Sequence, residues 1–111
     1  MVRALVAAAE ARDERGLCRM LHPGIRLTVD GGGIVGAPSS PLEGRSAASA
    51  YLAEALSAPA ALRVQAVNGA AGVVRCADGR VTGVLGLRSR GRLVVEAWLV
   101  VNPDKLTRWR C

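Results

Sequence analysis

The second half of the chain consists of strand-like runs, and this feature restricts the fold more than any other. Residues that favour strands, such as valine and leucine, fill four runs, residues 62–67, 73–77, 81–88 and 93–101. Asn68-Gly69 closes the first run and Asp78-Gly79 closes the second, and both dipeptides are common in hairpin turns. Strands joined by such short turns pair antiparallel. The sequence therefore predicts a meandering antiparallel sheet.

The first half of the chain predicts three helices. The first helix has an apolar stripe at helical spacing, Val2, Leu5, Val6 and Ala9. Asp13 is placed to cap a second, short helix, which we expect residues 22–24 to end. The apolar residues of that helix are Leu17, Met20 and Leu21. A third helix is expected to start near residues 44–46 and to stop before Pro59. Its apolar residues are Ala48, Tyr51, Leu52, Ala55 and Leu56.

One further strand separates the second helix from the third. Residues 25–29 alternate between apolar and polar, and the glycines that follow Asp30 end the run. Residues 34–35 are expected to form another short strand. Helices followed by antiparallel strands predict an α+β fold, with three helices packed on one face of a curved, mostly antiparallel sheet. With 111 residues we expect a single domain, 1–111, shaped as a cone whose mouth suits a small apolar ligand.

The last predicted strand is apolar on both faces. One face carries Leu93, Val95, Ala97, Leu99 and Val101. The other face carries Val94, Trp98 and Val100, interrupted by Glu96. A strand of this kind needs a cover on each side. The helices supply one cover, and a second copy of the chain is expected to supply the other, so the sequence predicts a homodimer through the sheet.

The charge of the chain does not by itself predict nucleic-acid binding. The net charge is +6, but the arginines are spread along the chain and aromatic residues make up 3% of it. Single-stranded nucleic acid is bound by basic grooves that also carry aromatic stacking platforms, and such platforms are scarce here. We expect no specific nucleic acid partner.

Cysteine and histidine usage bears on metals and on the compartment. The three cysteines and the single histidine have no metal-ligand spacing, so we expect no metal and no cofactor. We expect reduced thiols that act as small apolar residues, with Cys111 able to form an adventitious disulfide between chains. The apolar run at the N-terminus stops at Glu10, and no stretch approaches the ~20 residues of a membrane span. The expected location is the cytoplasm, not a membrane.

Three short motifs follow predicted strands: Asp30-Gly31-Gly32-Gly33, Val67-Asn68-Gly69 and Asn102-Pro103-Asp104-Lys105-Leu106. Together with the order of elements, they resemble the DGGGK, VNG and NPDKL signatures of one bacterial family. That family is the extracytoplasmic-function sigma factors with a SnoaL-like C-terminal domain, including the sigma-J type. The resemblance runs from the first helix to Leu106 and implies the nuclear-transport-factor-2-like (SnoaL-like) fold. The family has lysine where this chain has Ile34, which removes a charge that a partner or an anionic ligand would meet.

The resemblance implies two classes of function. In those sigma factors the C-terminal domain is regulatory and packs on the DNA-binding part, so we expect binding to a sigma factor or an RNA polymerase component, tuned by a small apolar ligand. This chain lacks the promoter-binding helical regions, so we expect a free-standing relative or an excised domain. The alternative is a free-standing, cofactor-independent SnoaL-like enzyme, a cyclase, isomerase or epoxide hydrolase. The sequence leaves open whether the chain is an enzyme.

Most candidates for binding a partner or ligand lie on the motif loops. They are Asp30, Gly31, Gly32, Gly33, Asn68, Trp98, Asn102, Asp104 and Lys105. Glycines permit a tight turn and leave backbone N–H groups accessible. The polar members have structural readings too, with Asp30 as a turn cap, Asn68 as a turn residue and Asp104 as an acceptor of backbone N–H groups. Trp98 would wall a pocket or fill a dimer interface.

The candidates for acid–base catalysis are Asp30, Glu96, Tyr51 and His22. Glu96 interrupts an apolar strand, so it must be paired, reach solvent or have a raised pKa. The structural alternative is an ion pair with Arg75 or Arg88. Tyr51 is placed to donate to a developing oxyanion or to pack in the core with its hydroxyl at the edge. His22 is the only histidine, and at a helix end it is either catalytic or structural.

Overall fold

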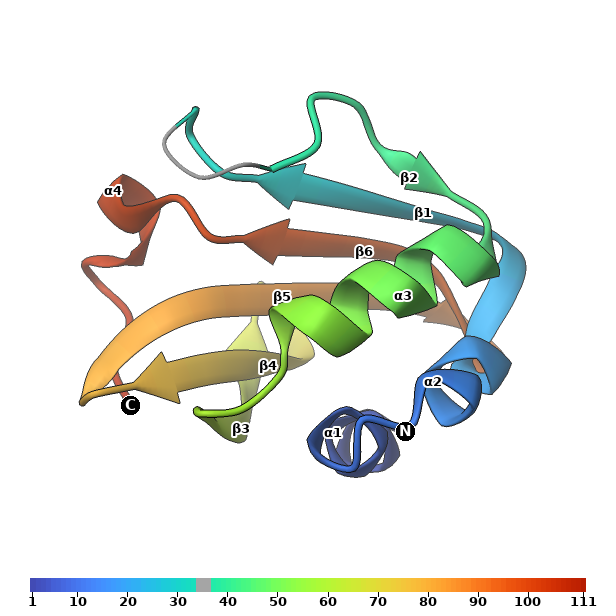
Figure 1. The fold of residues 1–111 in the computed structure, drawn as a ribbon, viewed down its shortest axis with the longest axis horizontal. Helices are drawn as coiled ribbons and strands as arrows, with labels where there is room; N and C mark the ends of the chain where they lie inside the picture. Colours follow the sequence, from blue (N-terminus) through green and yellow to red (C-terminus); the bar gives the residue numbers. More distant parts are fainter. Residues whose placement is uncertain (34–36) are drawn as a thin grey trace.

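Six strands form one bent sheet. They are β1 (Leu21–Asp30), β2 (Leu42–Glu43), β3 (Ala61–Val67), β4 (Ala70–Ala77), β5 (Arg80–Arg90) and β6 (Leu93–Val100). In this computed structural model, which describes residues 1–33 and 37–111, their order across the sheet is β2-β1-β6-β5-β4-β3 (Figure 1). The predicted antiparallel meander from β3 to β6 is confirmed. Because β1 pairs parallel with β6, the sheet is mixed.

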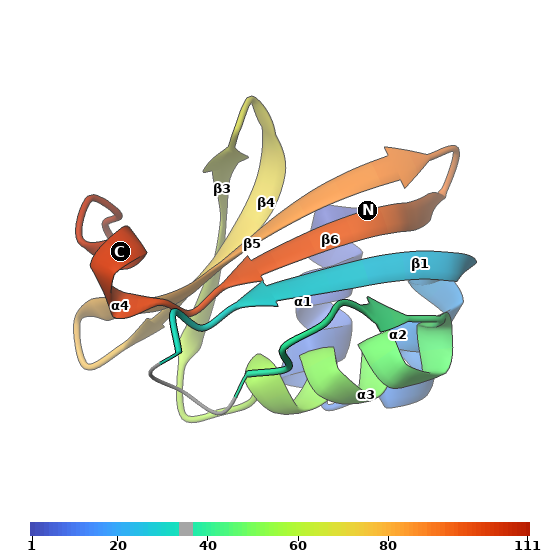
Figure 2. The ribbon, with the colours of Figure 1, turned by 90° about the horizontal axis from the view of Figure 1, so that it is seen from above.

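Three helices lie together on one side of the sheet (Figure 2). They are α1 (Val2–Glu10), α2 (Glu14–Met20) and α3 (Arg45–Ala55). The predicted apolar stripes supply the core between helices and sheet, which we call the first cluster. Its largest fully buried side chains are Leu5, Leu17, Leu21, Ile25, Leu27, Leu52, Val73, Leu85, Val94 and Leu99. This arrangement confirms the predicted α+β cone with helices on one face.

The end of the second helix differs from the prediction. Asp13 caps α2 as expected, its carboxylate accepting a hydrogen bond from the Gly16 N–H at 2.9 Å. The helix stops at Met20, and Leu21 already pairs with β6, so residues 22–24 lie inside β1 and do not terminate the helix. The strand tolerates Pro23 because the pairing with β6 is irregular between Leu21 and Arg26.

A bulge in β6 also changes which of its residues face the core. Arg88 of β5 pairs with Glu96, but the next residue, Ser89, pairs with Val94, so Val95 is an extra residue in β6. Val94 is therefore fully buried in the first cluster, while Val95 is half-buried. The prediction that Val94 shares a face with Trp98 and Val100 was wrong, because Val94 lies with Ala97 and Leu99 in the first cluster and the alternation was assumed to be unbroken.

The opposite face of the sheet carries a second apolar cluster. Its buried members are Val67, Val74, Cys76, Val84 and Leu106, with Val81, Val100 and Trp109 packed against them. Leu106 belongs to a short helix, α4 (Pro103–Leu106), which the sequence analysis did not predict as a helix. The second cover of the sheet at this end is thus the chain's own C-terminal segment. The expectation that a second copy of the chain covers this face is therefore wrong at the end of the sheet that carries the second cluster.

Two cysteines also differ from the prediction. Cys76 of β4 and Cys111 form a disulfide within the chain, with 6.0 Å between their Cα atoms. The expectation of three reduced thiols, and of a bond from Cys111 to another chain, is therefore corrected for this pair. The cause is tertiary, since the C-terminal segment returns over the sheet and brings Cys111 within the Cα separation that a disulfide needs. Cys18 remains a free thiol.

Two remaining expectations concern a short strand and a membrane-spanning helix. The short strand expected at residues 34–35 lies outside the described residues. Among the described residues, a two-residue strand that the sequence did not predict, β2, pairs antiparallel with β1 at Arg26 and Leu27. Across residues 1–33 and 37–111 no helix has the length and apolar character that crossing a membrane requires.

Candidate functional site

Two of the motif loops meet at one edge of the sheet. In the parallel pair of β1 and β6, Asp30 lies level with Val100, and the Val101 N–H donates to the Asp30 carbonyl at 2.8 Å. Parallel strands end at the same edge, so the loop after β1 and the loop after β6 emerge side by side. The register of these two strands therefore brings together segments that are 70 residues apart in the sequence.

An ion pair joins these two loops. Lys105 Nζ donates to Asp30 Oδ2 at 2.6 Å, while Asp30 Oδ1 accepts from the Gly32 N–H at 3.1 Å. The hydrogen bond from Lys105 is the main reason that the pKa of Asp30 lies below its usual value, and it outweighs the opposing effect of partial burial. Smaller contributions come from the charge of Lys105, from Gly32 and from Asn102. Asp30 is therefore a stable anion near neutral pH.

Gly32 and Asn102 lie close together where the two loops meet. A Cβ atom added to Gly32 would collide with the side-chain amide of Asn102, and Gly32 has a φ of +63°. Two separate reasons therefore favour glycine at this position: its positive φ, and the lack of space for a Cβ atom beside Asn102. Asn102 Oδ1 accepts from the Asp104 N–H at 3.2 Å and caps α4. The sequence predicted that Asp104 accepts hydrogen bonds from backbone N–H groups. In the structure the acceptor at this turn is the Asn102 side chain, and Asp104 supplies the N–H.

Most of the predicted binding residues are gathered here. Asp30, Gly32, Asn102 and Lys105 are linked by the contacts above, with Gly31 and Gly33 beside them in the loop and Asp104 exposed on α4. We call this group the two-loop site. Lys105 and Asp104 are exposed, so the site presents charges of both signs to solvent.

Asn68 and Trp98 lie elsewhere. Asn68 has a φ of +52° in the turn between β3 and β4, which confirms its reading as a turn residue. Trp98 is 40% exposed on the sheet face that points away from α1, α2 and α3, since its neighbours Ala97 and Leu99 face the first cluster. It borders a groove that also contains Gly86 and residues of the β3–β4 turn.

Glu96 is paired, as its structural reading predicted. Arg88 donates to Glu96 Oε1 at 3.0 Å, and the Glu96 side chain is 23% exposed. Arg26 of β1 lies level with Glu96 on its other side, and Arg26 itself pairs with Glu43 at 3.8 Å. A row of alternating charge thus crosses four strands on the outer face of the sheet.

Tyr51 and His22 are far from these groups. Tyr51 packs against the first cluster, and burial raises the pKa of its hydroxyl. Tyr51 therefore lies on the helix-covered side of the sheet and Trp98 on the other side, so the two side chains do not share a pocket. His22 is exposed, and its Nδ1 accepts from the Gly24 N–H at 2.9 Å, a local turn contact. Since His22 and Asp30 are near opposite ends of β1, they lie roughly 25 Å apart.

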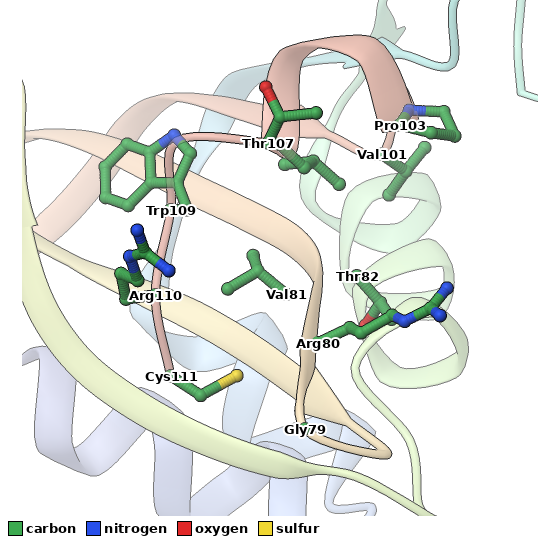
Figure 3. A pocket seen from close by; sticks show the side chains of 11 residues that line it. Gly79, Arg80, Val81, Thr82, Val101, Pro103, Thr107, Trp109, Arg110 and Cys111 are labelled. Atoms are coloured by element: carbon green, nitrogen blue, oxygen red, sulfur yellow. The ribbon is translucent and has the colours of Figure 1, made fainter.

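The structure contains a cavity that the sequence analysis did not predict. It lies between the turn that joins β4 to β5 and the segment after α4, and its volume is about 580 Å³ (Figure 3). Arg80, Trp109 and Arg110 line it, together with Cys111 of the disulfide. The apolar residues Leu106 and Trp109 and the presence of Cys76 and Cys111 are the signals in the sequence that could have placed the C-terminal segment on the sheet. In the described residues, no three His, Cys, Asp or Glu side chains gather as a metal site would require.

No protein-family model matches this sequence, and no curated protein matches it either. Several solved structures share its fold. The extracytoplasmic function sigma factor SigJ of Mycobacterium tuberculosis matches over 96% of this chain, with a TM-score of 0.69 and 22% identity. The match covers 42% of the SigJ chain, so this chain spans less than half of that protein.

Two smaller proteins match over most of both chains. A SnoaL-like protein of unknown function from Burkholderia thailandensis has a TM-score of 0.63 and 22% identity over 87% of each chain. An NTF-2 like protein of unknown function from Burkholderia xenovorans has a TM-score of 0.64 and 17% identity, over 98% of this chain and 89% of its own. With the helix-covered bent sheet described above, these likenesses show that the chain has the SnoaL-like, nuclear-transport-factor-2-like fold that its sequence predicted.

Proposed function

We propose that this chain is a regulatory domain that binds another protein through its two-loop site. The observation that carries the proposal is the Lys105–Asp30 ion pair of 2.6 Å, which fixes the two motif loops as one surface at the edge of the sheet. Loops on a rigid scaffold are where binding residues are usually found. The exposed charges of Asp104 and Lys105 and the backbone of the glycine loop are available to a partner.

The partner that we propose is a sigma factor or another RNA polymerase component. Support comes from the fold likeness to SigJ, an extracytoplasmic function sigma factor, over nearly the whole of this chain. These partners work in the cytoplasm, which is where we place this protein. A small apolar ligand would act by changing the shape of the domain beneath the two loops.

An enzymatic function has less support from the geometry. Acid–base catalysis needs an acid and a base within reach of one substrate. Asp30 lies at the edge of the sheet and Glu96 lies on its outer face. Tyr51 is half-buried on α3, against the first cluster, and His22 lies at the far end of β1. Glu96 is already paired with Arg88. Binding is therefore the function that the arrangement favours.

Self-association is a second part of the proposal. Trp98 is exposed beside the row of alternating charge formed by Arg88, Glu96, Arg26 and Glu43. In a two-fold interface the same patch meets itself, so an arginine of one copy is able to face a glutamate of the other. We propose that the homodimer forms through this outer face, with Trp98 at its centre.

Affinity capture from the native cell extract tests the proposed partner. The immobilised domain is expected to retain a sigma factor or an RNA polymerase subunit, identified by mass spectrometry. The affinity for the captured protein is then measured for Asp30→Asn and Asp104→Asn, and we expect each change to weaken binding about tenfold. Glu10→Gln, an exposed carboxylate on α1, is the matched control and should bind as the unmodified chain does.

A charge swap separates partner recognition from the stability of the loops. The double variant Asp30→Lys with Lys105→Asp keeps an ion pair between the loops but reverses the charges offered to a partner. We expect partner binding to be lost, while the free energy of unfolding falls by only about 1 kcal/mol, because lysine at position 30 no longer accepts the hydrogen bond from Gly32. Equal affinity in the swap and in both single variants would refute the two-loop site as the contact surface.

A further inference from the structure

The cavity beside the C-terminal segment lies outside the two-loop site and has the size of a small-molecule site. Its volume of about 580 Å³ lies within the range of 300–1,000 Å³ that is typical of ligand pockets. We propose that this cavity binds a small organic anion with a flat apolar body, an aromatic carboxylate in chemical class, and that the Cys76–Cys111 disulfide keeps the site formed. The proposal is independent of any protein partner.

The floor of the cavity is apolar. Val81 and Leu106 come from the second cluster, and Val101 adds a further aliphatic side chain. Figure 3 shows Val81 near the centre, with the indole of Trp109 to one side. An aromatic ring placed between these residues would bury its faces against aliphatic and indole surface, which is the main source of affinity for apolar ligands.

The rim of the cavity is basic. Figure 3 shows Arg110 on the same side as Trp109, and Arg80 on the other side near Thr82. Within residues 1–33 and 37–111, neither Arg80 nor Arg110 has a carboxylate within 4.0 Å. No aspartate or glutamate lines the cavity. Guanidinium groups bind carboxylates through paired hydrogen bonds, so two unengaged arginines beside an apolar floor select an anionic head group.

The wall that carries Arg110 depends on the disulfide. Trp109, Arg110 and Cys111 lie on the segment after α4, where Trp109 packs against the second cluster. Among the described residues, two hydrogen bonds and one disulfide also hold this segment. The Trp109 N–H donates to the Leu106 carbonyl at 3.1 Å, Gln65 Nε2 donates to the Arg110 carbonyl at 3.0 Å, and Cys111 is bonded to Cys76. Both hydrogen bonds are weak compared with a covalent bond, so the disulfide holds the end of the wall.

Reduction would therefore open the site. A dithiol reductant attacks the Cys76–Cys111 bond, forms a mixed disulfide and then closes its own disulfide. Two electrons and two protons pass from the dithiol to the protein, which leaves Cys76 and Cys111 as thiols. The covalent attachment of the wall is then lost, and Arg110 is free to leave the cavity. Disulfides are transient in a reducing compartment, so ligand binding in the cytoplasm would follow the redox state.

Binding of 1-naphthoate to the oxidised protein tests the site, with 1-naphthalenemethanol as an uncharged ligand of the same ring. Titration calorimetry is expected to show saturable naphthoate binding, with the alcohol at least tenfold weaker. Arg110→Gln, beside the Trp109 ring, should weaken naphthoate binding about tenfold, and Arg80→Gln, on the other side of the cavity, should weaken it by a smaller factor. Both changes should leave the affinity for the alcohol unchanged. Arg92→Gln, an exposed arginine in the β5–β6 turn, is the matched control. Absence of saturable binding, or equal naphthoate affinity in all three variants, would overturn the anion site.

The role of the disulfide is tested by the same titration, carried out after reduction with dithiothreitol and on the variant Cys111→Ser. Both samples are expected to lose at least tenfold in naphthoate affinity while circular dichroism shows an intact fold. Unchanged affinity in either folded sample overturns the role of the disulfide. If reduction unfolds the domain, the arginine variants, which keep the disulfide, still decide the anion site. Neither titration involves a sigma factor or polymerase, so failure here is distinguishable from failure of the proposed partner.

Discussion

Asp30 shows how one side chain can serve two of the roles proposed for it. Its Oδ1 atom caps the glycine turn through Gly32, and its Oδ2 atom meets Lys105 of the other loop. The structural reading is therefore confirmed, and the partner-binding reading remains a prediction about the surface that the pair creates. Glu96 is simpler, because its ion pair with Arg88 accounts for a carboxylate on an apolar strand.

Removing the partner of Asp30 is expected to change its titration. In Lys105→Gln, the carboxyl loses its strongest hydrogen bond and a nearby positive charge, so its pKa should rise towards the ordinary value of 3.8. The pKa of Asp30 is lowered in the folded state, so its contribution to stability is present above the unfolded-state pKa and is lost as the pH falls through the folded-state pKa. The carboxyl ¹³C chemical shift measured against pH reports the change.

Lys105→Arg is the control for this titration. It keeps the positive charge and a donor, so the pKa of Asp30 should stay low, and the acid midpoint of unfolding should move little. A carboxyl that titrates identically in Lys105→Gln and in the unmodified chain would contradict the assignment of Lys105 as the main cause.

The two loops of the site are elements whose conformation depends on each other. Gly32 and Gly33 both have positive φ, +63° and +75°, so alanine at either position carries a similar backbone cost of about 1 kcal/mol. Only at Gly32 would the added Cβ atom meet Asn102; at Gly33, apart from the glycine and its chain neighbours, no described atom lies within 4 Å of the added Cβ. The pair of positions therefore separates backbone strain from contact between the loops.

Gly32→Ala is accordingly expected to lower the free energy of unfolding by about 1–3 kcal/mol more than Gly33→Ala, since the side chain that caps α4 must move. Urea denaturation of the two variants measures the difference. In the same comparison, partner affinity should fall more in Gly32→Ala. Equal stability of the two variants would mean that the loops do not constrain each other.

Helices and hairpins were predicted well, because a local sequence pattern determines them. Features that depend on the pairing between strands were predicted less well. The apolar stripes of α1 and α3 and the turns at Asn68 and Asp78 predicted helices and hairpins near their observed bounds. The bulge at Val95 was missed because it results from the register between β5 and β6, not from the composition of β6. The helix α4 was missed because four residues are too few to show a period.

At the scale of the whole molecule, the homodimer is the prediction that the outer face supports. Sedimentation equilibrium at micromolar concentration is expected to give twice the 11.5 kDa mass of one chain. Trp98→Arg should convert the protein to a monomer, because it places a charge at the centre of the proposed interface. A mass near 11.5 kDa for the unmodified chain would exclude the dimer at that concentration.

Val64→Arg is the matched control for the interface. Val64 is 40% exposed, as Trp98 is, but it lies on the opposite face of the sheet, level with Val73 of the first cluster. A charge at this position should leave the dimer intact. If both variants become monomers, the loss of association is a general effect of added charge, and the outer face is not the specific interface.

The sequence by itself determined the order of the three main helices and of strands β1 and β3 to β6, and the buried side of each helix, because periodicity and turn residues act over a few neighbouring positions. The resemblance carried by its three motifs predicted the SnoaL-like fold. The sequence also identified most residues of the two-loop site, since their motifs follow strands. Only the tertiary structure decided that Asp30 meets Lys105, that Glu96 meets Arg88, and that Cys111 reaches Cys76. These contacts depend on the order of the strands in the sheet and on the return of the C-terminal segment over it. A pattern over a few neighbouring residues cannot predict either feature.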